Sequence, residues 1–139
     1  MNDAVSLALV RMGGRPCAIR CEHIAEIVPR VKLEHVPDSP PQVLGVINWR
    51  GRVVPVVDVR ARISDSSAAL PPYQYLVIVE AHARPIGLAV DDVRDVRSVR
   101  LVDVEKPGDL AGTGGPGVVR IDRELVLVVG PDDVLHVAS

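Results

Sequence analysis

The chain has 139 residues, a formal net charge of −2 at pH 7 and 47% hydrophobic residues, which suits one domain or two very small ones that share a core. Acidic and basic residues nearly balance and only 2% of residues are aromatic, which argues against a basic nucleic-acid-binding face and against a base-stacking platform. The sequence shows neither a signal peptide nor an apolar run near the ~20 residues of a membrane helix, so we expect a soluble, cytoplasmic protein without direct membrane insertion.

Valine is the commonest apolar residue, and its branched Cβ favours strands over helices. The first predicted strand, at 5–10, returns through a Gly13-Gly14 turn into a strand at 16–21, because glycine takes positive φ at little steric cost.

Apolar residues at helical spacing then predict a short helix or helical turn over 22–28 that ends before Pro29. Polar and apolar residues alternate over 31–35, which predicts a half-exposed strand.

The stretch 36–58 is the most informative part of the chain. Apolar strands at 44–49 and 53–59 flank an Arg-Gly-Arg turn, and both are apolar on nearly every residue. Such strands are covered on both faces, by the core or by a partner. Pro55 lacks a backbone N–H, so its strand is predicted to lie at an edge or to carry a bulge.

A second set of strands follows a polar, Pro-ended linker at 64–72. Its predicted members are residues 75–80, 85–90, 93–99, 118–121 and 125–129. A glycine-rich loop at 107–117 interrupts the set, and a last short helix begins at Pro131. About five strands in each half predict two small barrels packed together, at 1–66 and 73–139, with exchange of edge strands allowed.

Cys17, Cys21 and His23 are the nearest approach to a metal site, but their spacing matches no zinc pattern. On a strand, the two cysteines would share one face with Ile19 and pack as small hydrophobes. We therefore expect core packing rather than a metal, redox or disulfide role for them.

Other constellations are no more specific. The glycines at 112–117 precede a strand rather than a helix, so they predict a loop and not a phosphate cradle. Adjacent aspartates at 91–92 and 132–133 would point to opposite faces of a strand, and Asp91 is expected to bond backbone amides. The histidines are scattered, so no catalytic residue, metal or cofactor is predicted.

Arg50 is the most informative polar residue, because it follows an apolar strand and lies beside Trp49, Gly51 and Pro55. A solvated hairpin arginine would explain this placement. An anchor at the rim of an apolar interface would explain it equally, since Arg and Trp are enriched at binding hot spots.

Nearly the whole chain resembles the CheW-type coupling proteins of bacterial chemosensory systems. The matching motifs, in order, are Glu26-Ile27-Val28, Val36-Pro37, Gly45-Val46-Ile47-Asn48, Arg50-Gly51, Val53-Val54-Pro55-Val56-Val57-Asp58, Pro85-Ile86-Gly87-Leu88-Ala89-Val90-Asp91-Asp92-Val93, Gly117-Val118-Val119-Arg120-Ile121-Asp122 and Leu125-Val126-Leu127. Trp49 departs from the pattern, because the family usually has leucine there.

The resemblance implies an all-β fold with a few short helices, in which two five-stranded SH3-like barrels flank a shallow apolar groove. It also implies a non-enzymatic adaptor, recruited to membrane-associated receptor arrays. The implied partners are the cytoplasmic tip of a methyl-accepting chemoreceptor and the regulatory domain of a CheA-type histidine kinase.

Carried over by position, the resemblance implies two sets of contact residues. The receptor-binding set is Val36, Asn48, Trp49, Arg50, Gly51 and Val56, and the kinase-binding set is Val53, Val54, Leu88, Val90 and Val93. Two other interpretations remain open: a divergent member of the family that binds only one partner, and a small β-barrel enzyme or ligand-binding protein with a pocket between its halves.

Overall fold

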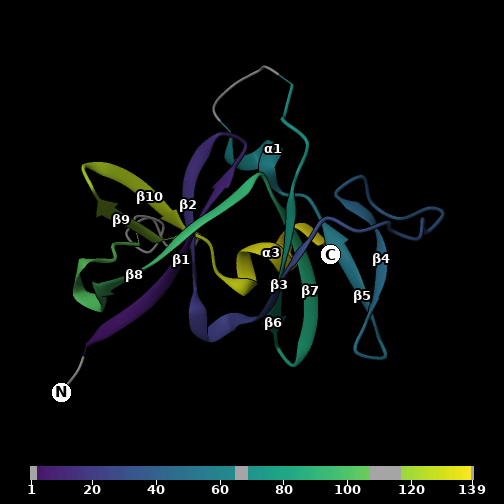
Figure 1. Cartoon of the computed structure of the whole chain (residues 1–139), viewed down its shortest axis with the longest axis horizontal. Helices are drawn as coiled ribbons and strands as arrows, with labels where there is room; N and C mark the ends of the chain where they lie inside the picture. The colour runs from purple at the N-terminus through teal and green to yellow at the C-terminus, as the bar shows by residue number, and fades with distance from the viewer. Residues whose placement is uncertain (1–2, 65–68, 107–116, 139) are drawn as a thin grey trace.

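The structure is a computed structural model that describes residues 3–64, 69–106 and 117–138, and Figure 1 shows its elements. The first sheet contains, in spatial order, β8 (Asp92–Arg100), β1 (Ala4–Met12), β2 (Arg15–Arg20), β10 (Glu124–Val128) and β9 (Gly117–Ile121). The second sheet contains β3 (Ile24–Pro29), β6 (Tyr75–Ala81), β7 (Arg84–Val90), β5 (Arg52–Val57) and β4 (Val43–Trp49). The short helices are η1 (Cys21–His23), α1 (Arg60–Ile63), η2 (Leu101–Asp103) and α3 (Pro131–Ala138). The prediction of an all-β fold with two five-stranded subdomains is confirmed.

The two sheets do not divide the chain at the predicted linker. The first sheet takes strands from 4–20 and 92–128, whereas the second takes all of its strands from 24–90. The division at 1–66 and 73–139 is corrected accordingly. Local patterning could not reveal this, because the β10–β2 and β5–β7 pairs are parallel contacts between segments far apart in sequence.

Of the helix or helical turn predicted over 22–28, only a helical turn at its start is present. A single 3₁₀ turn, η1, is followed directly by strand β3, which pairs antiparallel with β6. The β-branched residues Ile24, Ile27 and Val28 suit a pleated strand, and the pairing with β6 outweighs their helical spacing. The strand predicted at 31–35 is also reduced, to one bridge between Glu34 and Val46.

Within the described residues, four two-residue hairpins connect neighbouring strands, and all their central residues have positive φ. This is the type I′ geometry, whose twist matches that of the strands. Gly13 and Gly14 form the predicted first turn, and Arg50 and Gly51 form the turn between β4 and β5, so both predicted hairpins are confirmed.

Pro55 lies in an interior strand, which corrects the prediction of an edge. It pairs with Val46 on β4, while the parallel pairing of β5 with β7 begins only at Val56. Pro55 therefore stands before the part of β5 that has a neighbour on both sides. A register shift lies in the same hairpin, between Val43 and Gly45 of β4.

The largest core cluster joins the two sheets. It includes Val10 and Ile19 from the first sheet and Val57, Val77 and Leu88 from the second, all at most 2% exposed. Burial of each such side chain stabilises the fold by about 1.5–3 kcal/mol. The two subdomains thus share their largest core cluster.

Cys17 belongs to this core, and burial raises the pKa of its thiol to about 12. The expectation of core packing is confirmed for this cysteine. It does not extend to Cys21, because β2 ends at Arg20 and Cys21 is half-buried in η1.

Several sequence-based expectations concern other parts of the chain. The five strands predicted after the linker correspond to β6–β10, and α3 begins at Pro131 as predicted. Of the linker and the glycine-rich loop, residues 65–68 and 107–116 lie outside the described residues. In the described part, no helix is long and apolar enough to cross a membrane.

Candidate functional site

The turn between β4 and β5 brings three polar groups together at its base. The Arg50 guanidinium donates from Nη2 to Glu26 Oε1 at 2.8 Å, and Trp49 Nε1 donates to the same oxygen at 3.3 Å. The guanidinium carbon also lies 4.8 Å from the centroid of the Trp49 ring, a cation–π contact. Asn48 Oδ1 accepts from the Gly51 amide at 3.1 Å, which braces the turn.

These residues differ in burial: one supports the turn from below, and the others form its exposed surface. Trp49 is buried at the base, whereas Asn48, Arg50 and Gly51 are exposed, with 66% of the Arg50 side chain accessible. An exposed guanidinium on an aromatic ring is held in place while its remaining donors face solvent. We define these residues together with Glu26 as the Arg50 turn. Its chemistry suits recognition of a carboxylate or carbonyl on a partner.

Glu26 was not predicted as a site residue. It lies on β3, on the far side of the second sheet's strand order from β4, and reaches the turn only because the sheet curls. Its motif, Glu26-Ile27-Val28, is visible in the sequence. No sequence pattern, however, links Glu26 to Trp49 and Arg50, which follow it by 23 and 24 positions.

The other predicted receptor-binding residues are placed differently from one another. Val36 is exposed, in the segment before β4, whereas Val56 is fully buried in the core. Val56 therefore offers no surface to a partner in this structure, and its prediction as groove lining is corrected.

The predicted kinase-binding residues also divide by burial. Val53 is 75% exposed and Val93 is half-buried, so these two have accessible surface. Val54, Leu88 and Val90 are fully buried in core clusters and cannot contact a partner directly. Apolar strands on a sheet alternate between faces, and the sequence alone did not show which of these valines face the core.

A second arginine, Arg60 on α1, forms the most buried polar network of the described residues. It pairs with Asp58 at 2.9 Å and with Asp91 at 2.6 Å, and only 5% of its side chain is exposed. Burial alone would lower the pKa of Arg60, but hydrogen bonds to the two carboxylates outweigh it, so the pKa is raised. Arg60 remains charged, and this network was not predicted from the sequence.

Asp91 was expected to bond backbone amides, and it does. Its Oδ2 accepts from the Gly14 amide at 2.7 Å while Oδ1 is held by Arg60. The second aspartate pair is divided between two tasks: Asp133 accepts from the Gly130 amide at 2.7 Å, and Asp132 contacts His82 Nε2 at 2.7 Å. Neither pair forms a carboxylate dyad.

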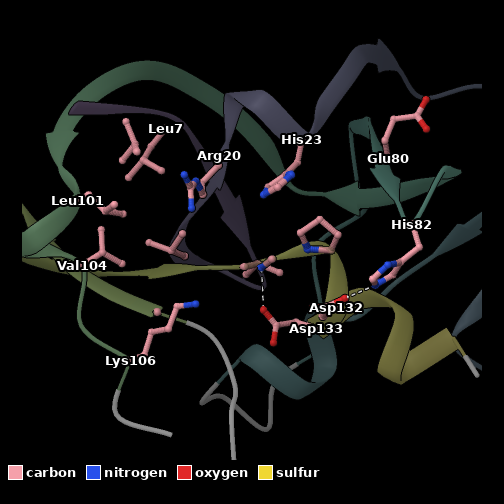
Figure 2. Close-up of a pocket in the computed structure, with 16 residues that line it drawn as sticks. Leu7, Arg20, His23, Glu80, His82, Leu101, Val104, Lys106, Asp132 and Asp133 are labelled. Atoms are coloured by element: carbon pink, nitrogen blue, oxygen red, sulfur yellow. Dashed lines mark hydrogen bonds and ion pairs between the residues drawn. The ribbon is translucent and has the colours of Figure 1, made fainter. Parts of the chain in front are cut away.

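A cavity of about 890 Å³ lies between the sheets, beside the start of α3 (Figure 2). Leu7 and Val104 contribute an apolar wall, while Arg20, His23 and Lys106 contribute polar groups. The lining is mixed rather than apolar, and it includes none of the predicted receptor-binding residues. Among the described lining residues there is no Ser, Thr or Cys to act as a nucleophile.

Cys17, Cys21 and His23 do not form a metal site in the described part of the chain, where no group of three or more His, Cys, Asp or Glu side chains could hold an ion.

Comparison with known proteins gives a consistent result. The family model described as "CheW-like domain" matches residues 6–139. The chain is 32% identical over 138 residues to "Chemotaxis protein CheW" of Rhizobium meliloti (strain 1021), an alignment that covers 96% of this chain and 88% of the relative.

Two more distant proteins extend the comparison. "Protein FrzA" of Myxococcus xanthus is 27% identical over 113 residues, which is 79% of this chain and 71% of that protein. The crystal structure of the "scaffolding protein TtCheW" from Thermoanaerobacter tengcongensis superposes with a TM-score of 0.74 at 22% identity, over 90% of this chain and 83% of that one. At that identity the match establishes the shared fold.

Proposed function

The chain belongs to the CheW-like domain family, and from this premise we propose that it is a non-enzymatic adaptor that couples the cytoplasmic tips of chemoreceptors to a CheA-type histidine kinase. The observation that carries the proposal is the family match over residues 6–139. The proposed place of action is the cytoplasm, at membrane-associated receptor arrays.

The proposed receptor contact is the Arg50 turn. Asn48, Arg50 and Gly51 are exposed there, and Glu26 and Trp49 hold the guanidinium in one place before a partner arrives. Such preorganisation reduces the entropy lost on binding. Val36 adds an exposed apolar side chain in the segment that precedes β4.

The proposed kinase contact is the accessible part of the predicted set. Val53 on β5 exposes 75% of its surface, an unusual fraction for a valine on a strand, and Val93 on β8 is half-buried. The buried members Val54, Leu88 and Val90 support these strands from within.

Substitution of Arg50 by glutamate tests the receptor contact. Since Arg50 is exposed, the fold should persist, while affinity for a receptor signalling-tip fragment should fall roughly tenfold or more, as at an interface hot spot. Trp49 is the only tryptophan, so its fluorescence reports binding at the turn directly.

Arg123→Glu is the matched control. Arg123 is also exposed and also has positive φ in a two-residue hairpin, but it lies in the first sheet, between β9 and β10. Unchanged tip affinity in Arg50→Glu, or an equal loss in both variants, would remove the site assignment.

Binding of the native chain to both partners tests the adaptor function itself. Size-exclusion chromatography with the receptor fragment and the kinase regulatory domain should yield a complex that contains all three. A complex with only one partner would favour a divergent family member, and binding of neither would overturn the proposal.

A further inference from the structure

We propose that Arg60 is a positioning residue that joins the two sheets at the base of the β4–β5 hairpin, and so fixes the orientation of the Arg50 turn relative to the first sheet. The structural part of this proposal stands by itself, and its consequence for coupling rests on the proposed function.

The side chain of Arg60 links three segments through charge-assisted hydrogen bonds. Nε and Nη2 donate to the two carboxylate oxygens of Asp58 at 2.9 and 3.0 Å, a bidentate pair. Nη1 donates to Asp91 Oδ1 and to the Pro71 carbonyl, both at 2.6 Å. Asp58 follows β5, Pro71 precedes β6, and Asp91 stands where the chain passes from β7 into β8.

Asp91 extends the network into the first sheet. Its second oxygen accepts from the amide of Gly14, in the turn between β1 and β2. The Asp91 amide donates in turn to the Arg11 carbonyl at 2.8 Å. One buried cation is thus connected, through a single aspartate, to strands of both sheets.

The same turn also packs against the helix that carries Arg60, as Figure 1 shows. A Cβ on Gly13 would lie 2.8 Å from Ser64 Cβ and 3.2 Å from the Arg60 carbonyl oxygen, and Gly13 has a φ of +64°. Arg15 Nη1 donates to the Ile63 carbonyl at 3.1 Å. The turn can approach α1 this closely only because Gly13 has no side chain.

The geometry of the network explains why it fixes the orientation of the two sheets and does not only hold them together. A planar guanidinium that makes a bidentate pair accepts a narrow range of orientations, and lysine could not reproduce it. The apolar core between the sheets is less selective, because hydrophobic contact is non-directional. The network therefore adds an angular constraint that the core does not supply.

The network also bears on the Arg50 turn, because the two lie at opposite ends of β5. This strand begins next to the turn and ends directly before Asp58. A strand held at one end by a buried ion network presents its hairpin in one direction. Loss of the network should leave the Arg50 turn intact but free to vary its angle to the first sheet.

The test needs a variant that folds without Arg60. Arg60→Met alone leaves two buried carboxylates without a cation, so it is expected to destabilise the chain. The triple variant Asp58→Asn/Arg60→Met/Asp91→Asn removes all three charges together, a change that buried ion networks tolerate better than loss of one member. The amide oxygen introduced by Asp91→Asn can still accept from the Gly14 amide.

Spin labels measure the orientation directly. Labels at Val53 on β5 and Leu125 on β10 are on different sheets at exposed positions, and a pair at Val53 and Pro29, which is exposed on β3, lies within the second sheet as a control. Cys21→Ser provides the background, since the buried Cys17 thiol, with a pKa of about 12, should resist labelling.

Electron-spin distance measurements should give a broader or shifted Val53–Leu125 distribution in the triple variant and an unchanged Val53–Pro29 distribution. A between-sheet distribution equal to that of the native chain would overturn the proposal, because a purely stabilising network lowers the folded fraction without altering folded molecules. A change in both pairs would also overturn it, since the defect would then lie within a sheet.

The coupling consequence has its own measurement. The folded triple variant should bind the receptor fragment and the kinase domain singly within about twofold of the native affinity, yet form the three-component complex at least fivefold less well. Native-like assembly in a variant with a changed between-sheet distance would overturn this consequence. Failure of the native chain to bind either partner would instead refute the proposed function and leave the distance result intact.

Discussion

Two arginines, Arg50 and Arg60, stand near opposite ends of β5, and each bonds carboxylates, yet their surroundings differ completely. Arg50 exposes 66% of its side chain and pairs with Glu26, which is also partly exposed. Arg60 exposes 5% and pairs with two carboxylates that are themselves largely buried. The exposed arginine has donors left for a partner, whereas the buried one uses its donors within the fold.

The comparison shows that solvent access separates the two arginines: one lies at the surface, where the receptor contact is proposed, and the other joins segments inside the fold. In water an ion pair contributes little, because both charges are already well solvated. In the interior the charges lack that solvation, so each depends on its partner. Exposure therefore decides which arginine can be changed without loss of the fold.

The largest expected effect on the free energy of unfolding comes from substitution of the buried Arg60. Arg60→Met should lower the free energy of unfolding by about 3–5 kcal/mol, because Asp58 and Asp91 are left without their cation. Urea denaturation measures the change, with Arg62→Met on the same helix as an exposed control. An equal, small effect of both substitutions would break the comparison.

A much smaller effect on stability is expected at the exposed end. Arg50→Met removes the pair with Glu26 and should lower the free energy of unfolding by at most about 1 kcal/mol. The same denaturation experiment measures it. A loss as large as that of Arg60→Met would show that the Arg50 turn is a structural element rather than a free recognition surface.

The smallest expected effect on stability is at a third ion pair, Arg97–Asp122, which extends the comparison to the first sheet. Arg97 donates from Nη1 and Nη2 to the two carboxylate oxygens of Asp122 at 2.8 and 2.9 Å. This hydrogen bonding lowers the pKa of Asp122. Because that pKa is depressed in the folded state, any stabilisation by the pair is present above the ordinary aspartate pKa and is lost as pH falls through the folded value. NMR titration of the Asp122 carboxyl should show a low midpoint that returns to the ordinary range in Arg97→Met. An unchanged midpoint would show that the two side chains do not pair in solution.

Much of the fold could be predicted from local patterns. Valine-rich runs and glycine turns predicted the hairpins at Gly13-Gly14 and Arg50-Gly51, because two-residue turns depend on nearby backbone geometry. The helix or helical turn predicted over 22–28 is only a single turn at its start, because pairing of β3 with β6, a strand much later in the chain, outweighed the local spacing.

The sequence by itself determined the family and the β-rich class, since these depend on composition and on motifs in order along the chain, and it singled out Arg50 as a candidate contact residue. Tertiary structure alone decided that the sheets draw on interleaved segments, that Glu26 supports Arg50, and that Val54, Val56, Leu88 and Val90 lie in the core. It also assembled Asp58, Arg60 and Asp91 into one network. Side chains that meet across 31 residues of chain carry no local signal, because their contact depends on how the sheets fold together rather than on spacing.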